Sequence, residues 1–172
     1  MGYELKIRRY ELLLIVLFTI VCYFSFNPVV FDSHSNKVAD HIHNFEAGDS
    51  IGFLSGFNLE EGRIKVVLII KDKSELIKDF PRGKVFYLDN IETLKEMQEK
   101  CLFIVTKSDI ATVENQVIVY KNNRIIYESN FVLDDNIQGI QNSRYGWMLS
   151  KNTNFAFYLK QFERSYWPIF IK

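Results

Sequence analysis

The stretch Leu12–Phe31, LLLIVLFTIVCYFSFNPVVF, carries no charged side chain and constrains this chain more than any other feature of the sequence. A helix of that length measures about 30 Å, at about 1.5 Å per residue, which matches the hydrocarbon thickness of a bilayer. A soluble protein rarely needs a helix that is apolar on every side, because its core covers one face only. We therefore expect a transmembrane helix here, and we expect Pro28 to kink or end it.

The flanks of this stretch predict its orientation. Lys6, Arg8 and Arg9 precede it, whereas Asp32 follows it and the first base beyond is Lys37. Lysine and arginine are enriched on the cytoplasmic side of membrane helices. We therefore expect a cytoplasmic N-terminus, a single pass through the cell (inner) membrane, and an extracytoplasmic, periplasmic C-terminal part in a bacterial cell.

Two other interpretations of the N-terminus stay open. A cleaved signal peptide requires small residues at its cleavage site, and Phe24–Asn27 offers a poor one. A lipid-modified cysteine at Cys22 requires a small residue before it, where this chain has Val21. The retained anchor explains the sequence better than either.

Charge and composition exclude one class of partner. The chain has 21 basic and 21 acidic residues, and the bases are scattered along it. Binding to DNA or RNA depends on a concentrated basic surface, so we expect no nucleic-acid partner. The sequence also contains no pattern that indicates a cofactor or a small-molecule substrate.

The two cysteines are far apart in the predicted organisation. Cys22 lies within the apolar stretch and Cys101 at the end of a predicted helix, so a bridge between them is geometrically implausible. The domain must therefore be stabilised by its core and not by a disulfide.

These observations divide the chain into three parts. Residues 1–31 form the cytoplasmic N-terminus and the anchor, residues 32–46 a polar spacer, and residues 47–172 one extracytoplasmic α/β domain. The last part is long enough to bury its own hydrophobic core.

Hydrophobic runs within the domain predict alternating strands and helices. The expected strands are 64–70, 84–88 and 102–106, and the expected helices between them are 75–80 and 90–100, the second capped by Asp89 or Asn90. Strand 64–70 is apolar enough to be covered on both faces. The alternating order predicts right-handed parallel crossovers in an α/β sheet.

The C-terminal third follows a different pattern. Segments 116–120 and 125–128 predict a β-hairpin, because Asn122 and Asn123 between them tolerate positive φ. Segment 147–149 is typical of a short strand or a helix end, and Asn154 can cap a last helix. The apolar end, Trp167–Lys172, is expected to pack onto the domain.

The order of these elements resembles the thioredoxin-like superfamily, in particular its membrane-anchored extracytoplasmic redoxins. Ala47–Ile51 stands in the place of the Gly-Asp segment that begins the domain in that family, Lys65–Ile70 in that of the central strand, and Gln116–Glu128 in that of the hairpin. The resemblance covers roughly residues 46–129. It implies one thioredoxin-like domain with a mixed sheet, a β-hairpin and flanking helices.

The active-site residues of that family are missing from this chain. The redoxins place Cys-x-x-Cys at the start of the helix after the central strand, where the helix dipole lowers the thiolate pKa. This sequence has Lys71–Glu75 there, without cysteine, and Val113–Asn115 where the family has a cis-proline. A chain without this thiol pair has no disulfide exchange of its own.

Other candidate chemistry is weak. His41 and His43 could place two imidazoles on one side of a strand, but a solvated spacer explains them better than a metal site. Cys101 with a histidine could form a nucleophilic pair, although core packing is the commoner role. The acidic pairs Glu60–Glu61 and Asp134–Asp135 are more typical of solvated loops than of general acid–base catalysis.

The candidate interaction residues come from the aromatic C-terminal third. Tyrosine, tryptophan and arginine are the residues that most often anchor protein interfaces. The candidates are Arg144, Tyr145, Trp147, Tyr158, Arg164, Tyr166 and Trp167. The competing explanation is that most of these rings complete the core and one covering helix.

Two functional hypotheses follow. The first is a non-catalytic, membrane-anchored accessory subunit whose extracytoplasmic domain docks on a membrane protein or an exported protein. The second is a thiol–disulfide oxidoreductase-like enzyme that works with the cysteines of a partner. Both include contact with the lipid bilayer through Leu12–Phe31.

Overall fold

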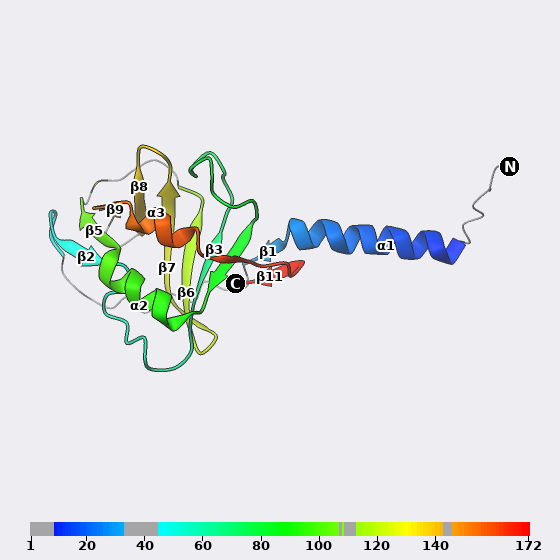
Figure 1. The fold of residues 1–172 in the computed structure, drawn as a ribbon, viewed down its shortest axis with the longest axis horizontal. Coiled ribbons are helices and arrows are strands. Elements are labelled where there is room, and N and C mark those ends of the chain that lie inside the picture. The colour runs from blue at the N-terminus through cyan, green and yellow to red at the C-terminus, as the bar shows by residue number, and fades with distance from the viewer. Residues whose placement is uncertain (1–8, 33–44, 107, 109–112, 143–145) are drawn as a thin grey trace.

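The computed structural model describes residues 9–32, 45–106, 108, 113–142 and 146–172. Figure 1 shows α1 extending away from a mixed α/β body, with β1 and β11 at the junction. The elements are α1 (Arg9–Phe26), β1 (Val29–Phe31), β2 (Ser50–Gly52), β3 (Ile64–Ile69), β4 (Val85–Leu88), α2 (Ile91–Lys100), β5 (Leu102–Val105), β6 (Gln116–Lys121), β7 (Arg124–Leu133), β8 (Gln138–Asn142), β9 (Gly146–Ser150), α3 (Asn154–Leu159), β10 (Glu163–Arg164) and β11 (Ile169–Ile171).

The larger of the two described sheets has nine strands in the order β10-β4-β3-β6-β7-β8-β9-β5-β2. Every neighbouring pair in it is antiparallel. The predicted parallel crossovers are therefore wrong. The predicted hairpin of β6 and β7 is confirmed, with Asn122 at φ 50° and Asn123 at φ 63° in its turn.

The segment after β3 explains the change of topology. Residues 75–80, predicted as a helix, form turns instead, because tertiary contacts bond their backbone. Ile77 N–H donates to the Leu133 carbonyl, and Leu133 N–H donates to the Glu75 carbonyl. Without a helix to carry the chain across the sheet, β4 returns antiparallel beside β3.

Strand β3 is covered on both faces, as predicted. Val66 and Leu68 lie in the main core, whereas Val67 and Ile69 belong to a second cluster on the opposite face. The main core includes four packed rings, those of Phe53, Phe103, Phe131 and Phe155.

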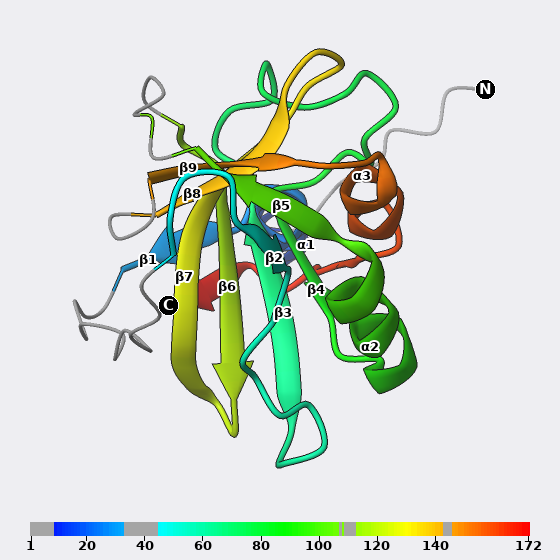
Figure 2. The same ribbon diagram turned by 90° about the vertical axis from the view of Figure 1, so that its left-hand side faces the viewer.

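Helices α2 and α3 lie side by side against the main core (Figure 2). Asn90 caps α2 as predicted, since its side chain accepts a hydrogen bond from Thr93 N–H at 2.9 Å. The predicted last helix is also present, but Thr153 is its N-cap residue and Asn154 is its first residue. Segment 147–149 forms part of strand β9.

Strands β1 and β11 form a separate two-stranded parallel sheet, with Val29, Val30 and Phe31 opposite Ile169, Phe170 and Ile171. Val30 and Phe170 pack on the second cluster of the large sheet. The expectation that Trp167–Lys172 packs onto the domain is therefore correct only in part, because Trp167 is 78% exposed and Ile171 66% exposed.

The helix α1 is shorter than the apolar stretch that predicted it. It ends at Phe26, and the last apolar residues form β1 instead. Pro28 lacks the amide hydrogen that would continue the helix, and the Asn27 backbone N–H makes the last turn by donating to the Tyr23 carbonyl at 2.9 Å. None of the residues of α1 is buried, and α1 is long and apolar enough to cross a membrane.

Candidate interaction site

Arg164 connects the end of α1 to the large sheet. It lies in β10, opposite Phe86 of β4. Its Nη2 donates to the carbonyl oxygen of Phe26, the last residue of α1, at 2.9 Å. Its guanidinium carbon lies 4.8 Å from the centre of the Phe26 ring and 5.1 Å from that of Tyr166.

These contacts suit the chemistry of the groups. The carbonyl groups at a helix C-terminus carry partial negative charge, which favours a nearby cation. A guanidinium over the face of an aromatic ring is attracted by the ring quadrupole. The rings of Phe26 and Tyr166 also meet edge to face, with centroids 6.0 Å apart. Residues far apart in the sequence therefore form one packed junction.

A groove of about 700 Å³ begins at this junction. One wall is the outer face of β3 and β4 and the loop that follows, and the other is the segment that leads into and includes β11. The lining residues are Lys65, Val67, Val85, Tyr87, Asp89 and 164–171. We call this surface the junction groove.

The junction groove combines apolar walls with a few polar groups. Val67 and Val85 supply apolar surface, while Lys65 and Asp89 supply charges of opposite sign. Tyr87 donates a hydrogen bond to Glu163 at 2.9 Å, and this bond raises the pKa of the Tyr87 hydroxyl. Such a surface can hold an extended peptide segment through apolar contact and a small number of polar contacts.

The structure brings together three of the predicted interaction residues. Arg164, Tyr166 and Trp167 all line the junction groove, and Tyr166 and Trp167 are 57% and 78% exposed. Arg144 and Tyr145 lie outside the described residues.

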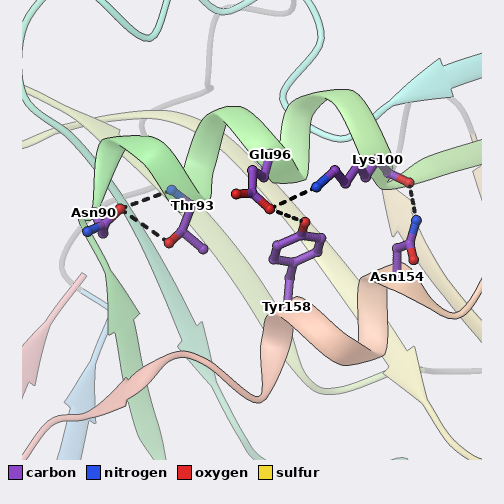
Figure 3. A network of polar contacts seen from close by, with 6 residues as sticks. All are labelled: Asn90, Thr93, Glu96, Lys100, Asn154 and Tyr158. Carbon is purple, nitrogen blue, oxygen red and sulfur yellow. Dashed lines mark hydrogen bonds and ion pairs between the residues drawn. The ribbon is translucent and has the colours of Figure 1, made fainter.

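Trp147 and Tyr158 have core positions instead. Trp147 is 2% exposed and packs with Val113 and Val132. Tyr158 is 3% exposed, and its hydroxyl points from α3 to α2, where it donates to Glu96 at 2.6 Å (Figure 3). The rings of these two residues therefore complete the core, as the competing explanation expected.

Figure 3 also shows how the polar atoms around Tyr158 are satisfied. Glu96 accepts a second hydrogen bond from Lys100 at 3.0 Å, and the Asn154 side chain donates to the Lys100 carbonyl at 3.0 Å. The hydrogen bond to Glu96 raises the pKa of the Tyr158 hydroxyl. This network fastens α3 to α2 and leaves the tyrosine hydroxyl engaged within the fold.

Cys101 is a core residue in the structure. Its side chain is 0% exposed, and burial raises the pKa of its thiol to about 12. Because the thiolate is the nucleophile, such a thiol is unreactive near neutral pH. This finding gives no support to the thiol-exchange hypothesis as far as Cys101 is concerned.

The remaining candidates for chemistry are placed as follows. Glu60 forms an ion pair with Lys95 at 2.8 Å, and Glu61 forms one with Lys121 at 3.2 Å, all at the surface. Asp134 accepts hydrogen bonds from the backbone N–H groups of Asn136 and Ile137 in a turn. Each of these carboxylates therefore has a local structural partner.

The two candidate metal ligands cannot be placed. His41 and His43 lie outside the described residues. Within the described part of the chain, no group of three or more histidine, cysteine, aspartate or glutamate residues could hold a metal ion.

Sequence reasoning missed several residues of the junction. Phe26 was hidden within the apolar stretch, and nothing in the local sequence links Lys65 or Tyr87 to the C-terminal segment. The signal available in the sequence was the richness of the C-terminal third in aromatic residues, interleaved with Arg144, Lys160 and Arg164.

A scan against protein-family models, a search of curated proteins and a search of solved structures found no significant match to this chain. The thioredoxin-like resemblance stays a prediction from the sequence. The structure itself is mixed α/β, with a mostly antiparallel arrangement of strands and one apolar N-terminal helix.

Proposed function

We propose that this protein is a single-pass, membrane-anchored accessory subunit whose domain lies outside the cytoplasm and docks, without catalysis of its own, on another membrane protein. The single observation that carries this proposal is the position of the junction groove. Its walls include Arg164, which is hydrogen-bonded to the last residue of α1. A groove at the end of a membrane-spanning helix faces partners held in the same membrane.

The residues around the groove support a protein partner. Arginine, tyrosine and tryptophan dominate the energetics of protein interfaces because each offers a large contact area together with a polar group. Tyr87 supplies one of these residue types on the β4 wall of the groove, and Lys65 and Asp89 beside it add charges of opposite sign. An extended extracytoplasmic loop of a membrane protein fits the mixed polarity of the groove.

The contacts at the junction also fix the position of the groove relative to α1. Arg164 bonds to α1, and β11 pairs with β1, which follows α1 directly. The side chain of Lys172 is 6% exposed and contacts the carboxylates of Asp32 and Glu128, which fixes the end of β11 to β7. The anchor and the groove are therefore joined at three points, as expected of a subunit that presents a surface at a fixed distance from the membrane.

The experiment is site-specific photocrosslinking in the native cell. A photoreactive phenylalanine derivative replaces Tyr87 in the groove or, as the matched control, Phe157, which is 62% exposed on α3, a helix whose buried residues pack in the main core on the opposite face of the sheet. We expect an adduct with one integral membrane protein from the Tyr87 position and no such adduct from the Phe157 position.

A second measurement tests whether the adduct reflects docking. In mild detergent, co-purification of the crosslinked protein should be lost with Tyr87→Glu and retained with Phe157→Glu. Identical crosslinking patterns from both positions, or a lone monomer recovered from the native membrane, would contradict the proposed function.

A further inference from the structure

The two-stranded sheet of β1 and β11 is apolar on both faces. Its inner face, Val30 and Phe170, packs on the large sheet. Its outer face carries Phe31, Ile169 and Ile171, which are 53%, 56% and 66% exposed. A strand pair with apolar side chains on both faces is typical of a sheet that is covered on both sides, and the structure supplies only one cover.

The exposed aromatic residues next to this sheet extend the same surface. Tyr166 and Trp167 directly precede β11 and are 57% and 78% exposed. We call Phe31, Tyr166, Trp167, Ile169 and Ile171 the junction patch. Among the described residues outside α1, the other large exposed hydrophobic side chains are single residues on separate elements, namely Ile91, Ile137, Leu149 and Phe157.

The length of α1 indicates what covers the junction patch. The charge-free part of the helix, from Leu12 to Phe26, measures about 22 Å at about 1.5 Å per residue, whereas the hydrocarbon core of a bilayer is about 30 Å thick. The whole of α1 can cross a membrane, but when its charge-free part fills the hydrocarbon from the Leu12 end, apolar depth remains beyond Phe26. The next residues of the chain, in β1, and their partners in β11 are apolar, and they lie where that depth remains.

The chemistry of the patch also matches a membrane interface. Tryptophan and tyrosine gather at the boundary between headgroups and acyl chains, because one part of each ring system is apolar and the other polar. Arg164, beside Tyr166, can keep its charge in the headgroup layer while its stem lies on apolar surface.

The outer edges of the β1–β11 sheet set a limit on depth. A two-stranded sheet has unpaired backbone groups along both outer edges, and these are costly within hydrocarbon. The sheet can therefore lie at the boundary, where water and headgroups satisfy those groups, and not deeper.

We propose that the junction patch lies against the headgroup and upper acyl region of the bilayer that α1 spans, so that residues 166–171 form a second membrane contact. This inference rests on the proposed membrane span of α1. It assigns the membrane to the outer face of the β1–β11 sheet and leaves Lys65 and Tyr87 of the junction groove to the protein partner.

Tryptophan fluorescence tests this inference with a control inside the same chain. The sequence has two tryptophans: Trp167 in the patch and Trp147, which is 2% exposed in the core. The full chain is reconstituted into phosphatidylcholine vesicles whose acyl chains carry bromine, a contact quencher, near the glycerol end or near the methyl end. In the Trp167→Phe variant the remaining tryptophan is Trp147 in the core. In the Trp147→Phe variant the remaining tryptophan is Trp167 in the patch.

We expect bromine near the glycerol end to quench the wild-type chain and Trp147→Phe, and to leave Trp167→Phe almost unquenched. Bromine near the methyl end should quench Trp167 less. If Trp147→Phe does not fold, the difference between wild type and Trp167→Phe gives the same result, since Trp167 is a surface residue.

Flotation of the vesicles distinguishes a wrong patch assignment from a wrong membrane span of α1. A chain that floats with the vesicles but whose Trp167 is unquenched, or is quenched more strongly from the methyl end, overturns the patch assignment and leaves the span of α1 intact. Shielding of Trp167 from both lipid bromine and aqueous acrylamide overturns it too, because protein then covers the patch. A chain that does not float refutes the membrane span itself.

Discussion

Replacing Arg164 should loosen the junction between α1 and the domain. The substitution Arg164→Met keeps a long apolar side chain and removes the guanidinium. It abolishes the 2.9 Å hydrogen bond to the Phe26 carbonyl and the contacts with the rings of Phe26 and Tyr166. The proposed membrane span keeps α1 in the micelle when the domain unfolds in urea, so unfolding breaks these contacts and they count toward the stability of the folded domain.

The magnitude follows from the individual contacts. A hydrogen bond from a charged donor contributes about 1.5 kcal/mol at the low end of its range, appropriate for a half-buried group. Each cation–ring contact adds about 0.5 kcal/mol at an exposed site. These contributions add to about 2.5 kcal/mol. The buried Nε of Arg164 has no hydrogen-bond partner, which costs about 1 kcal/mol, and Arg164→Met removes this cost. We therefore expect Arg164→Met to reduce the free energy of unfolding by about 1.5 kcal/mol.

The assay is urea unfolding of the full chain in mild detergent, followed by the fluorescence of the buried Trp147. The matched control is Lys160→Met, which removes a surface ion pair with Asp79 at 2.6 Å and should leave the urea midpoint unchanged. Arg164→Lys, which retains charge but not the planar group, should fall between wild type and Arg164→Met. Equal midpoints for Arg164→Met and Lys160→Met would refute the reasoning.

Three further predictions concern the domain itself. Asn115→Ala should destabilise the domain by about 3 kcal/mol, because the buried Asn115 amide makes four hydrogen bonds at 2.7–3.0 Å that hold the segment after β3. In urea unfolding, the exposed control Asn58→Ala should change stability little. A loss below about 1 kcal/mol for Asn115→Ala would argue against the network. Burial raises the pKa of the Glu75 carboxyl above its ordinary 4.5, with repulsion from neighbouring carboxylates adding to it, so folding favours the protonated form and stability falls as the pH rises from about 4.5 through the raised pKa. Glu75→Gln should flatten this part of the pH–stability curve, and an unchanged slope would contradict the assignment. Cys101 should resist maleimide in the folded protein and react in urea, as followed by mass spectrometry; rapid labelling of the native chain would show that the thiol is accessible.

Local sequence patterns predicted the parts of the fold that depend on neighbouring residues. The aliphatic run of β3 indicated a strand covered on both faces, Asn90 indicated the start of α2, and Asn122–Asn123 indicated the β6–β7 turn. In each case the physical cause lies within a few residues of the signal.

The wrong predictions depend on contacts between distant segments. Residues 75–80 form backbone hydrogen bonds with Leu133 and not the expected helix, and the expected parallel crossover depended on that helix. The pairing of β1 with β11 joins residues separated by almost the whole chain, and no hydrophobic periodicity in the sequence indicates this pairing. The end of α1 at Phe26, just before Pro28, is the end that the local sequence indicated, but the pairing of Val29–Phe31 with β11 was not indicated.

The candidate site could be predicted only in composition. The aromatic and basic C-terminal third indicated an interaction surface, and Arg164, Tyr166 and Trp167 do line a groove. The same pattern could not separate them from Trp147 and Tyr158, whose rings are buried. Which rings face outward depends on the antiparallel register of the sheet, which the sequence did not indicate.

The most direct test of the account is the side of the membrane on which the domain lies. Ser55→Cys places a thiol at an exposed position of the domain, in a Cys22→Ser background where the other cysteine, Cys101, is buried. A membrane-impermeant maleimide should label this thiol while the cytoplasmic membrane is sealed. Labelling that appears only after the cytoplasmic membrane is opened would place the domain in the cytoplasm and contradict the account.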